Sequence, residues 1–246
     1  MSTKKKIFDM YDLRMPLNDK ELQKNKLFIE KVFKYNYIPY LDRYKNRKDM
    51  KILEIGSNKG FMSSCIKQYF EDADVIGVDL SPNDIEFAKK NNSNIQFFCM
   101  DAFEILKKEK FDVIISKDVM EHIDKNKQEV FVDKIYNSLN EGGIAIIQVP
   151  NMDWILASHE RYMDFTHEVG YTQESLKDIF RIYFDNNNIK VVPSSYIFKE
   201  ALKQKICFGI IRPILVKFIK FIFKILGEGA ADICFEHREI MAIVKK

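Results

Sequence analysis

The sequence contains few of the residues that build metal clusters or disulfide frameworks. Its 246 residues include four cysteines, four histidines and one tryptophan. The cysteines are widely separated and no Cys-x-x-Cys pair occurs, which argues against a structural zinc site and against a disulfide-stapled fold. A chain without a disulfide framework suits a reducing compartment, and we predict a cytoplasmic protein.

A large charge imbalance and an N-terminal signal segment are also missing. The formal net charge is only +3, which does not indicate a nucleic-acid-binding protein, and we expect no nucleic-acid partner. The basic residues Lys4, Lys5 and Lys6 are not followed by the apolar core of a signal peptide. With 46% hydrophobic and 30% charged residues, the chain has a globular composition and is long enough to bury a core.

From Met50 onward, short apolar segments alternate with segments of helical character. We expect strands at residues 51–55, 75–79, 95–98, 111–116, 143–149, 189–192 and 239–244. Most of these are apolar at consecutive positions, as in strands that are covered on both faces. The helix after Ser81 has clear signals, since Ser81 suits the N-cap and Pro82 the first turn. The alternation predicts an α/β fold with a doubly wound, mostly parallel sheet.

Residues 54–60, Glu-Ile-Gly-Ser-Asn-Lys-Gly, form the turn between the first strand and the first helix of this pattern. Gly56 and Gly60 permit a tight turn and a close approach of the backbone to a ligand. Ligands of doubly wound sheets bind at the carboxyl ends of the strands, where this turn lies. Taken alone, the turn fits NAD as well as S-adenosylmethionine, and it also fits a tight connection without a ligand.

The following strands end in residues that suit a nucleoside ligand. Asp79 ends the second strand, at the position where a carboxylate accepts hydrogen bonds from ribose hydroxyls. Asp101 follows the third strand and can accept a hydrogen bond from an exocyclic amine such as that of adenine. The fourth strand runs into Ser116 and Lys117, and a Gly-Gly pair at residues 142–143 precedes the fifth.

In order and spacing, residues 50–151 resemble class I S-adenosylmethionine-dependent methyltransferases. The block at residues 118–123, Asp-Val-Met-Glu-His-Ile, is similar to the family's segment after strand four. Asn58 departs from the Gly-x-Gly-x-Gly-like turn of the family, although Asn is the non-glycine residue that best tolerates positive φ. The resemblance implies a seven-stranded Rossmann-like sheet with an antiparallel last strand. It also implies S-adenosylmethionine as cofactor, S-adenosylhomocysteine as product, and cofactor contacts from Glu54, Gly56, Ser57, Asn58, Gly60, Asp79, Leu80, Asp101, Ala102, Ser116 and Lys117.

We divide the chain into an N-terminal helical lid segment, residues 1–49, and a methyltransferase domain, residues 50–246. The domain carries a basic apolar helical insertion at about 203–226. Ile206 to Leu226 is long enough to span a bilayer, but Arg212, Lys217, Lys220 and Lys224 argue against a span. The lysines recur at helical spacing on a Phe/Ile-rich cylinder. Two interpretations remain: peripheral contact with the inner face of a membrane, or packing on protein, including a homodimer through residues 206–226.

Candidate catalytic residues lie after strands four and five. If the acceptor is a hydroxyl, a base assists the loss of its proton, and histidine is the commonest choice. We predict His167 as the base, Asp164 as the residue that orients it, and His122 as the second candidate. A polar surface loop and a helix-start histidine are the alternatives. The spacing of His159, Asp164 and His167 fits no strong metal motif, and we predict no metal site.

Residues 161–168 and 171–176 resemble methyltransferases of bacterial surface-polysaccharide pathways. This resemblance implies O-methyl transfer to a small sugar-type or phosphorylated precursor in capsule polysaccharide biosynthesis. Another small molecule, such as a quinone, is the alternative acceptor. A rival hypothesis is a catalytically silent methyltransferase-like module that binds a membrane or a partner.

Overall fold

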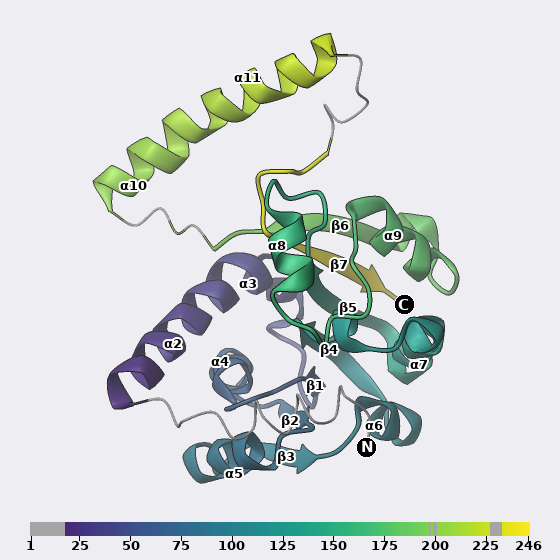
Figure 1. Cartoon of the computed structure of the whole chain (residues 1–246). Coiled ribbons are helices and arrows are strands. Elements are labelled where there is room, and N and C mark those ends of the chain that lie inside the picture. The colour runs from purple at the N-terminus through teal and green to yellow at the C-terminus, as the bar shows by residue number, and fades with distance from the viewer. Residues whose placement is uncertain (1–17, 197, 199–200, 227–232) are drawn as a thin grey trace.

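The computed structural model describes residues 18–196, 198, 201–226 and 233–246. Its centre is a seven-stranded sheet of order β3-β2-β1-β4-β5-β7-β6 (Figure 1). Strands β1 to β5 pair in parallel, and β7 pairs antiparallel with both β5 and β6. This order confirms the predicted fold class. The strands are β1 (Lys51–Ile55), β2 (Asp74–Asp79), β3 (Gln96–Cys99), β4 (Phe111–Lys117), β5 (Leu139–Pro150), β6 (Ile189–Ser194) and β7 (Glu239–Lys245).

The central strands are apolar on consecutive positions because helices cover both faces of the sheet. In β4, Ile114 packs into one core layer, while Val113 and Ile115 pack into the other. Strand β5 is longer than predicted because it already pairs at Leu139, which lies opposite Phe111. The register between the two strands shifts after Phe111, so the extra residues form an irregular start to β5.

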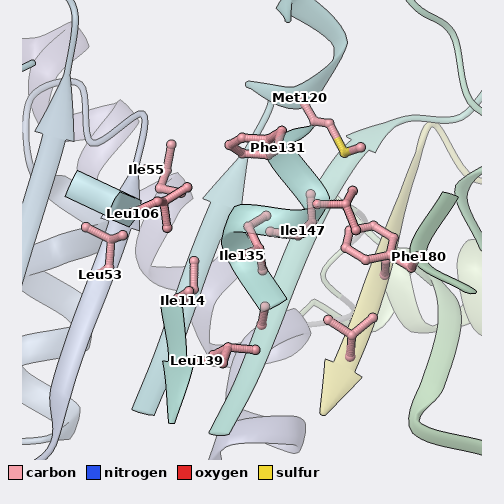
Figure 2. Packing of buried hydrophobic residues seen from close by; sticks show 14 of the residues in the cluster. Leu53, Ile55, Leu106, Ile114, Met120, Phe131, Ile135, Leu139, Ile147 and Phe180 are labelled. Atoms are coloured by element: carbon pink, nitrogen blue, oxygen red, sulfur yellow. The ribbon is translucent and has the colours of Figure 1, made fainter. Parts of the chain in front are cut away.

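Two helical layers enclose the sheet. One contains α6 (Ala102–Lys108), α7 (Gln128–Ser138) and α9 (Gln173–Arg181), and Figure 2 shows Phe131 and Ile135 of α7 packed over Ile114 and Ile147. The other contains α2 (Asp19–Val32), the π-helical turn η1 (Phe33–Tyr37), α3 (Ile38–Leu41), α4 (Phe61–Tyr69) and α5 (Pro82–Asn91). Short 3-10 turns are η2 (Asp42–Tyr44), η3 (Met120–His122), η4 (Lys125–Lys127) and η5 (Asn186–Asn188).

The predicted lid segment contributes to the second layer. Val32, Phe33, Tyr37 and Leu41 are buried in its core, whereas residues 1–17 of the segment lie outside the described residues. Within this predicted helical segment, α2 is α-helical to Val32 and the chain continues as η1.

Short polar residues begin the helices directly after the strand ends. Ser81 accepts a hydrogen bond from the Asp84 N–H, 3.1 Å away, and confirms the predicted start of α5. Asp101 caps α6 after β3, and Thr172 caps α9 after the isolated bridge between Asn151 and Tyr171. These caps turn the chain immediately at the carboxyl edge of the sheet, so the polar residues that follow each strand are gathered along one edge.

A helical segment stands away from this body. It consists of α10 (Leu202–Ile206), the π-helical turn η6 (Cys207–Ile211) and α11 (Arg212–Ile225), and Figure 1 shows it outside the two layers. None of its residues is buried. It touches the segment before β7, where the Arg212 guanidinium donates to the Glu236 carbonyl and the Phe223 ring lies 5.6 Å from the Phe235 ring. Among the described helices, none combines the length and apolarity needed to cross a bilayer.

Candidate active site

The turn after β1 is fixed by the strands beside it. The backbone N–H groups of Gly56 and Ser57 both donate to the Val78 carbonyl of β2, at 2.8 and 3.0 Å. Gly56, Asn58 and Gly60 all have positive φ values, 77°, 46° and 77°. A β-carbon at Gly56 would overlap the Val119 side chain, so the end of β4 closes against the turn. The geometry explains both glycines and shows that Asn58 adopts the left-handed conformation expected of the family's middle glycine.

Asp79 is oriented by this turn. Its carboxylate accepts the Asn58 N–H and the Ser81 N–H, each at 2.9 Å. Burial raises the pKa of Asp79, and these two backbone donors counteract the shift. A carboxylate offers about four acceptor positions, so it keeps capacity for two adjacent hydroxyls. This arrangement suits the predicted ribose contact.

Glu54 lies behind the turn rather than on its surface. It is buried, and the Ser63 hydroxyl of α4 donates to its carboxylate. Burial raises the pKa of Glu54 to about 8, and the Ser63 hydrogen bond opposes that rise. Glu54 therefore ties β1 to α4 beneath the turn.

The remaining predicted cofactor residues divide into exposed and buried groups. Asp101 is exposed, and one of its carboxylate oxygens caps α6 by accepting the Phe103 N–H at 2.8 Å. Leu80, the residue directly after β2, is 61% exposed. The hydroxyls of Ser57 and Ser116 are buried and have no hydrogen-bond partner within the described part of the chain. Unpartnered buried hydroxyls at two neighbouring strand ends fit a polar ligand that would satisfy them.

The side chain of Lys117 interacts with neighbouring residues of the protein. Its ammonium pairs with Asp118, and it lies 5.7 Å from the centre of the Tyr196 ring. Burial lowers the pKa of Lys117, but the negative charge of Asp118 and the hydrogen bond to it outweigh that effect and raise the pKa. Asp118 has a φ of 54°, which directs the chain from β4 into η3. Because its ammonium is already paired, the cofactor contact expected of Lys117 is one through its backbone.

Two imidazoles meet beside this strand end. The rings of His122 and His167 have centroids 4.8 Å apart. Nδ1 of His122 lies 2.8 Å from the Thr166 hydroxyl, which itself donates to Asp164 at 2.7 Å. Nδ1 of His167 lies 2.9 Å from the Glu160 carbonyl. The structure thus brings together the three predicted catalytic residues. The orienting contact differs from the prediction, because Asp164 is linked through Thr166 to His122, whereas Nδ1 of His167 lies against the Glu160 carbonyl.

The loop that carries His167 is held by backbone contacts. The N–H groups of Glu168 and Val169 donate to the Glu121 carbonyl, at 2.7 and 3.2 Å. The Arg161 guanidinium donates to the carbonyls of His167 and Glu168, at 2.7 and 3.2 Å. These contacts fix the loop against η3, so the imidazole pair is built on a supported backbone.

The sequence prediction missed two residues of this cluster. Thr166 bridges Asp164 and His122, and Glu121 is a buried carboxylate next to the imidazoles. Burial raises the pKa of Glu121 well above its usual range. Its only signal in the sequence is its place before His122 in the 118–123 block. His159, in contrast, is exposed on α8 (Ala157–Tyr162) and is not a member of the cluster.

A second polar network was also missed, because its members are far apart in sequence. Buried Gln148 of β5 accepts hydrogen bonds from the hydroxyls of Tyr37 and Ser194, both at 3.1 Å. Its amide donates to the Tyr196 hydroxyl at 2.9 Å. The network joins η1, β5 and β6 beside the Lys117–Asp118 pair, and it anchors one aromatic residue of the predicted lid against the sheet.

The sheet order, the antiparallel β7 and the turn after β1 together define the Rossmann-like fold of S-adenosylmethionine-dependent methyltransferases. A family model described as a methyltransferase domain matches residues 28–183, and the chain belongs to this family. S-Adenosylmethionine is the cofactor of this class of protein.

Comparisons with individual proteins agree with this family. The chain is 22% identical over 165 residues to a malonyl-[acyl-carrier protein] O-methyltransferase of Bacillus anthracis, covering 66% of this chain and 60% of that protein. It is 32% identical over 111 residues to a ubiquinone biosynthesis O-methyltransferase of Pelagibacter ubique, covering 44% and 45%. It thus spans less than two thirds of either relative. A SAM-dependent methyltransferase structure from Archaeoglobus fulgidus superposes with a TM-score of 0.66 at 20% identity, covering 90% and 94% of the two chains, and shares the fold.

Proposed function

We propose that this protein transfers the methyl group of S-adenosylmethionine to a hydroxyl oxygen of a small molecule. The observation that carries the proposal is the His122–His167 pair beside the glycine turn. Val119, which packs on Gly56, lies only three residues before His122. The segment after β4 therefore carries both a residue that packs on the cofactor turn and one of the two imidazoles.

The Gly56 turn and the backbone after Ser116 would hold the methionine part of the cofactor, Asp79 would hold its ribose, and Leu80, Asp101 and Ala102 would contact its adenine. The open Asp79 acceptors and the unpartnered hydroxyls of Ser57 and Ser116 support this placement. When bound, the cofactor supplies a methyl group that is activated by its positively charged sulfur. The protein then mainly aligns the acceptor oxygen with that carbon.

The imidazole pair assists the acceptor hydroxyl in losing its proton. His122 is oriented through Thr166 and Asp164, and His167 is oriented by the Glu160 carbonyl. Fixed imidazoles are effective because proton transfer requires hydrogen-bond reach to the reacting hydroxyl. We include both histidines and Asp164 in the catalytic apparatus.

For the acceptor, we propose a polar sugar-type or phosphorylated precursor of surface glycans. The support is the resemblance of residues 161–168 and 171–176 to methyltransferases of those pathways. A lipid-soluble phenol of the quinone type is the second candidate. It is favoured by the exposed apolar surface of α11 and by the similarity to the ubiquinone biosynthesis enzyme.

We place α10–α11 at the anionic inner face of a membrane. Residues 201–226 contain six basic and no acidic residues. On α11, Phe218, Phe221 and Ile225 are 59%, 59% and 67% exposed along one side, while Lys217, Lys220 and Lys224 form the adjacent side. An apolar face flanked by lysines matches the acyl–headgroup boundary of an anionic bilayer.

Activity is tested by S-adenosylhomocysteine formation with two acceptor panels, nucleotide-linked or phosphorylated sugars and short-chain phenolic quinone precursors. We expect turnover with one panel and a loss of at least about 100-fold in His167→Ala, in the range of general acid–base contributions. His159→Ala is the matched control, since this histidine lies outside the cluster. Equal activity of His167→Ala and wild type would refute the catalytic role.

Membrane contact is tested by co-sedimentation with vesicles that contain phosphatidylglycerol. Replacing Lys217, Lys220 and Lys224 by Gln removes about 1 kcal/mol per lysine, so we expect roughly 100-fold weaker binding. Phe221→Ser should weaken vesicle binding at any salt concentration, whereas the loss of binding caused by the three Lys→Gln substitutions should be largest at low salt. Absence of vesicle binding together with a stable dimer in sedimentation would contradict the membrane proposal.

A further inference from the structure

We infer that Glu121, His122 and His167 bind a divalent first-row transition cation at the active site. The inference that a cation binds rests on the geometry of these three side chains alone. Its use, to hold the acceptor oxygen, rests on the proposed O-methyl transfer. No such site was expected from the sequence, because Glu121 and His167 are separated by 45 intervening residues and belong to different elements.

The three side chains already converge. One nitrogen from each imidazole and one Glu121 oxygen lie within 4.8 Å of one another. Ligands held at about 2.1 Å from a cation lie roughly 3 to 4 Å apart, so small side-chain rotations complete the site. Two histidines and one carboxylate form the ligand set of catalytic zinc sites and of non-haem iron sites, which leave further positions open.

The hydrogen bonds fix which ring nitrogens carry the lone pairs. The Thr166 hydroxyl donates its hydrogen to Asp164, so its oxygen must accept the Nδ1–H of His122. The Glu160 carbonyl can only accept, so Nδ1 of His167 also carries hydrogen. Nε2 of each imidazole is then the nitrogen that can supply a lone pair to the cation. A metal-binding histidine usually donates its other N–H to a carbonyl or to a carboxylate-linked group, as both do here.

Glu121 supplies the negative ligand. It is only 2% exposed, and both of its oxygens lack a hydrogen-bond partner among the residues that the structure describes. Buried carboxylates are normally paired or coordinate a metal, because an unpaired buried charge is strongly unfavourable. Its backbone carbonyl holds the His167 loop through Glu168 and Val169. The same residue therefore positions the loop and faces the imidazoles that the loop completes.

A bound cation would serve the transfer by polarising the acceptor, and the two histidines would then act as its ligands in place of taking the acceptor proton themselves. The hydroxyl binds through its oxygen and loses its proton to solvent, because a cation lowers the pKa of a bound hydroxyl. That oxygen forms the new O–C bond as the C–S bond breaks, and sulfur retains the electron pair. The products are the methyl ether, S-adenosylhomocysteine and one proton.

The test is a titration of the EDTA-treated full chain with Co²⁺, followed by visible absorbance and calorimetry. We expect one Co²⁺ per chain. Glu121→Gln and His167→Ala should show no binding at Co²⁺ concentrations that saturate the wild type. Thr166→Val keeps all three ligands but removes the hydroxyl that contacts the His122 ring, and should weaken Co²⁺ binding by about 10- to 100-fold. Circular dichroism and thermal unfolding establish that each variant is folded.

Two histidine variants serve as controls. His159→Ala replaces a histidine that, among the described residues, does not belong to any cluster of side chains that could hold a metal ion. His237 belongs to a second cluster of this kind, with Cys234 and Glu236, and His237→Ala disrupts that cluster. Both should bind Co²⁺ as the wild type does. Loss of Co²⁺ binding in His237→Ala with retention in Glu121→Gln would overturn the assignment, as would a wild type that binds no Co²⁺.

S-Adenosylhomocysteine binding to the EDTA-treated protein separates the two proposals. We expect it to be unchanged in Glu121→Gln and Thr166→Val. Cofactor binding and full turnover in EDTA would overturn the cation's role while leaving the methyltransferase proposal intact. Stoichiometric Co²⁺ binding at this site without cofactor binding would overturn the methyltransferase proposal and leave the cation site standing.

Discussion

Replacing Glu54 by Gln should change how stability depends on pH. The carboxyl is buried beneath the cofactor turn, and its pKa rises from the usual 4.5 to about 8. Between these values the folded protein binds a proton that the unfolded chain has released. The free energy of unfolding therefore falls as pH rises through this window, and no further loss from this group occurs above about pH 8.

The size of the effect follows from the pKa difference. Each pH unit between the two pKa values corresponds to about 1.4 kcal/mol, so ionising buried Glu54 costs roughly 5 kcal/mol in total. Gln has nearly the same shape, accepts the Ser63 hydrogen bond and stays neutral. We expect the stability advantage of Glu54→Gln over wild type to grow by roughly 4 kcal/mol from pH 5 to pH 8.

Urea unfolding of both proteins at intervals from pH 5 to pH 9 measures this difference. Other buried carboxylates titrate in both chains, so the difference between the two curves isolates Glu54. Glu86→Gln on the exposed side of α5 is the control and should change stability by less than about 0.5 kcal/mol at any pH. A Glu54→Gln advantage that is the same at pH 5 and pH 8 would refute the argument from burial.

Three further predictions concern the glycine turn, Asp79 and the segment before β7. Gly56→Ala and Gly142→Ala both place alanine at positive φ, which costs about 1–2 kcal/mol, but only Gly56 also meets a neighbouring side chain. Calorimetry should therefore show weaker S-adenosylhomocysteine binding in Gly56→Ala alone. Asp79→Ala should weaken the same binding by at least about 10-fold with the fold retained, since a charged hydrogen bond contributes about 1.5–3 kcal/mol; unchanged affinity would exclude the ribose contact. Asn151→Ala leaves two carbonyls before β7 without their amide donor and should lower the unfolding free energy by roughly 2–3 kcal/mol in urea.

Local signals were sufficient for most of the fold. Ser81 and Pro82 begin α5 where predicted, because capping depends on residues within one turn. The central strands were visible as apolar runs, because burial on both faces leaves little room for polar residues. The early start of β5 was not visible, since it depends on pairing between Leu139 and Phe111 rather than on either residue alone.

The candidate cofactor site was predictable to a similar degree. Parallel strands end at one edge, so the residues after β1, β2, β3 and β4 had to be neighbours once the sheet was recognised. The interactions of each side chain at this edge could not be predicted from the sequence. The Lys117 ammonium forms an ion pair with Asp118, and the buried Glu54 carboxylate accepts a hydrogen bond from Ser63 of α4. These outcomes depend on which side of a strand end each side chain occupies.

The sequence by itself determined which polar residues follow the strands and, through its resemblance to a known family, indicated the methyltransferase class. Only the tertiary structure placed Glu121 and Thr166 with the two histidines, and only it joined Tyr37 to Gln148 across 111 positions. The physical reason is the range of the forces involved. Turns, caps and apolar runs are set by neighbours in sequence, whereas the pairing of a buried carboxylate or hydroxyl depends on which distant segments the core brings together.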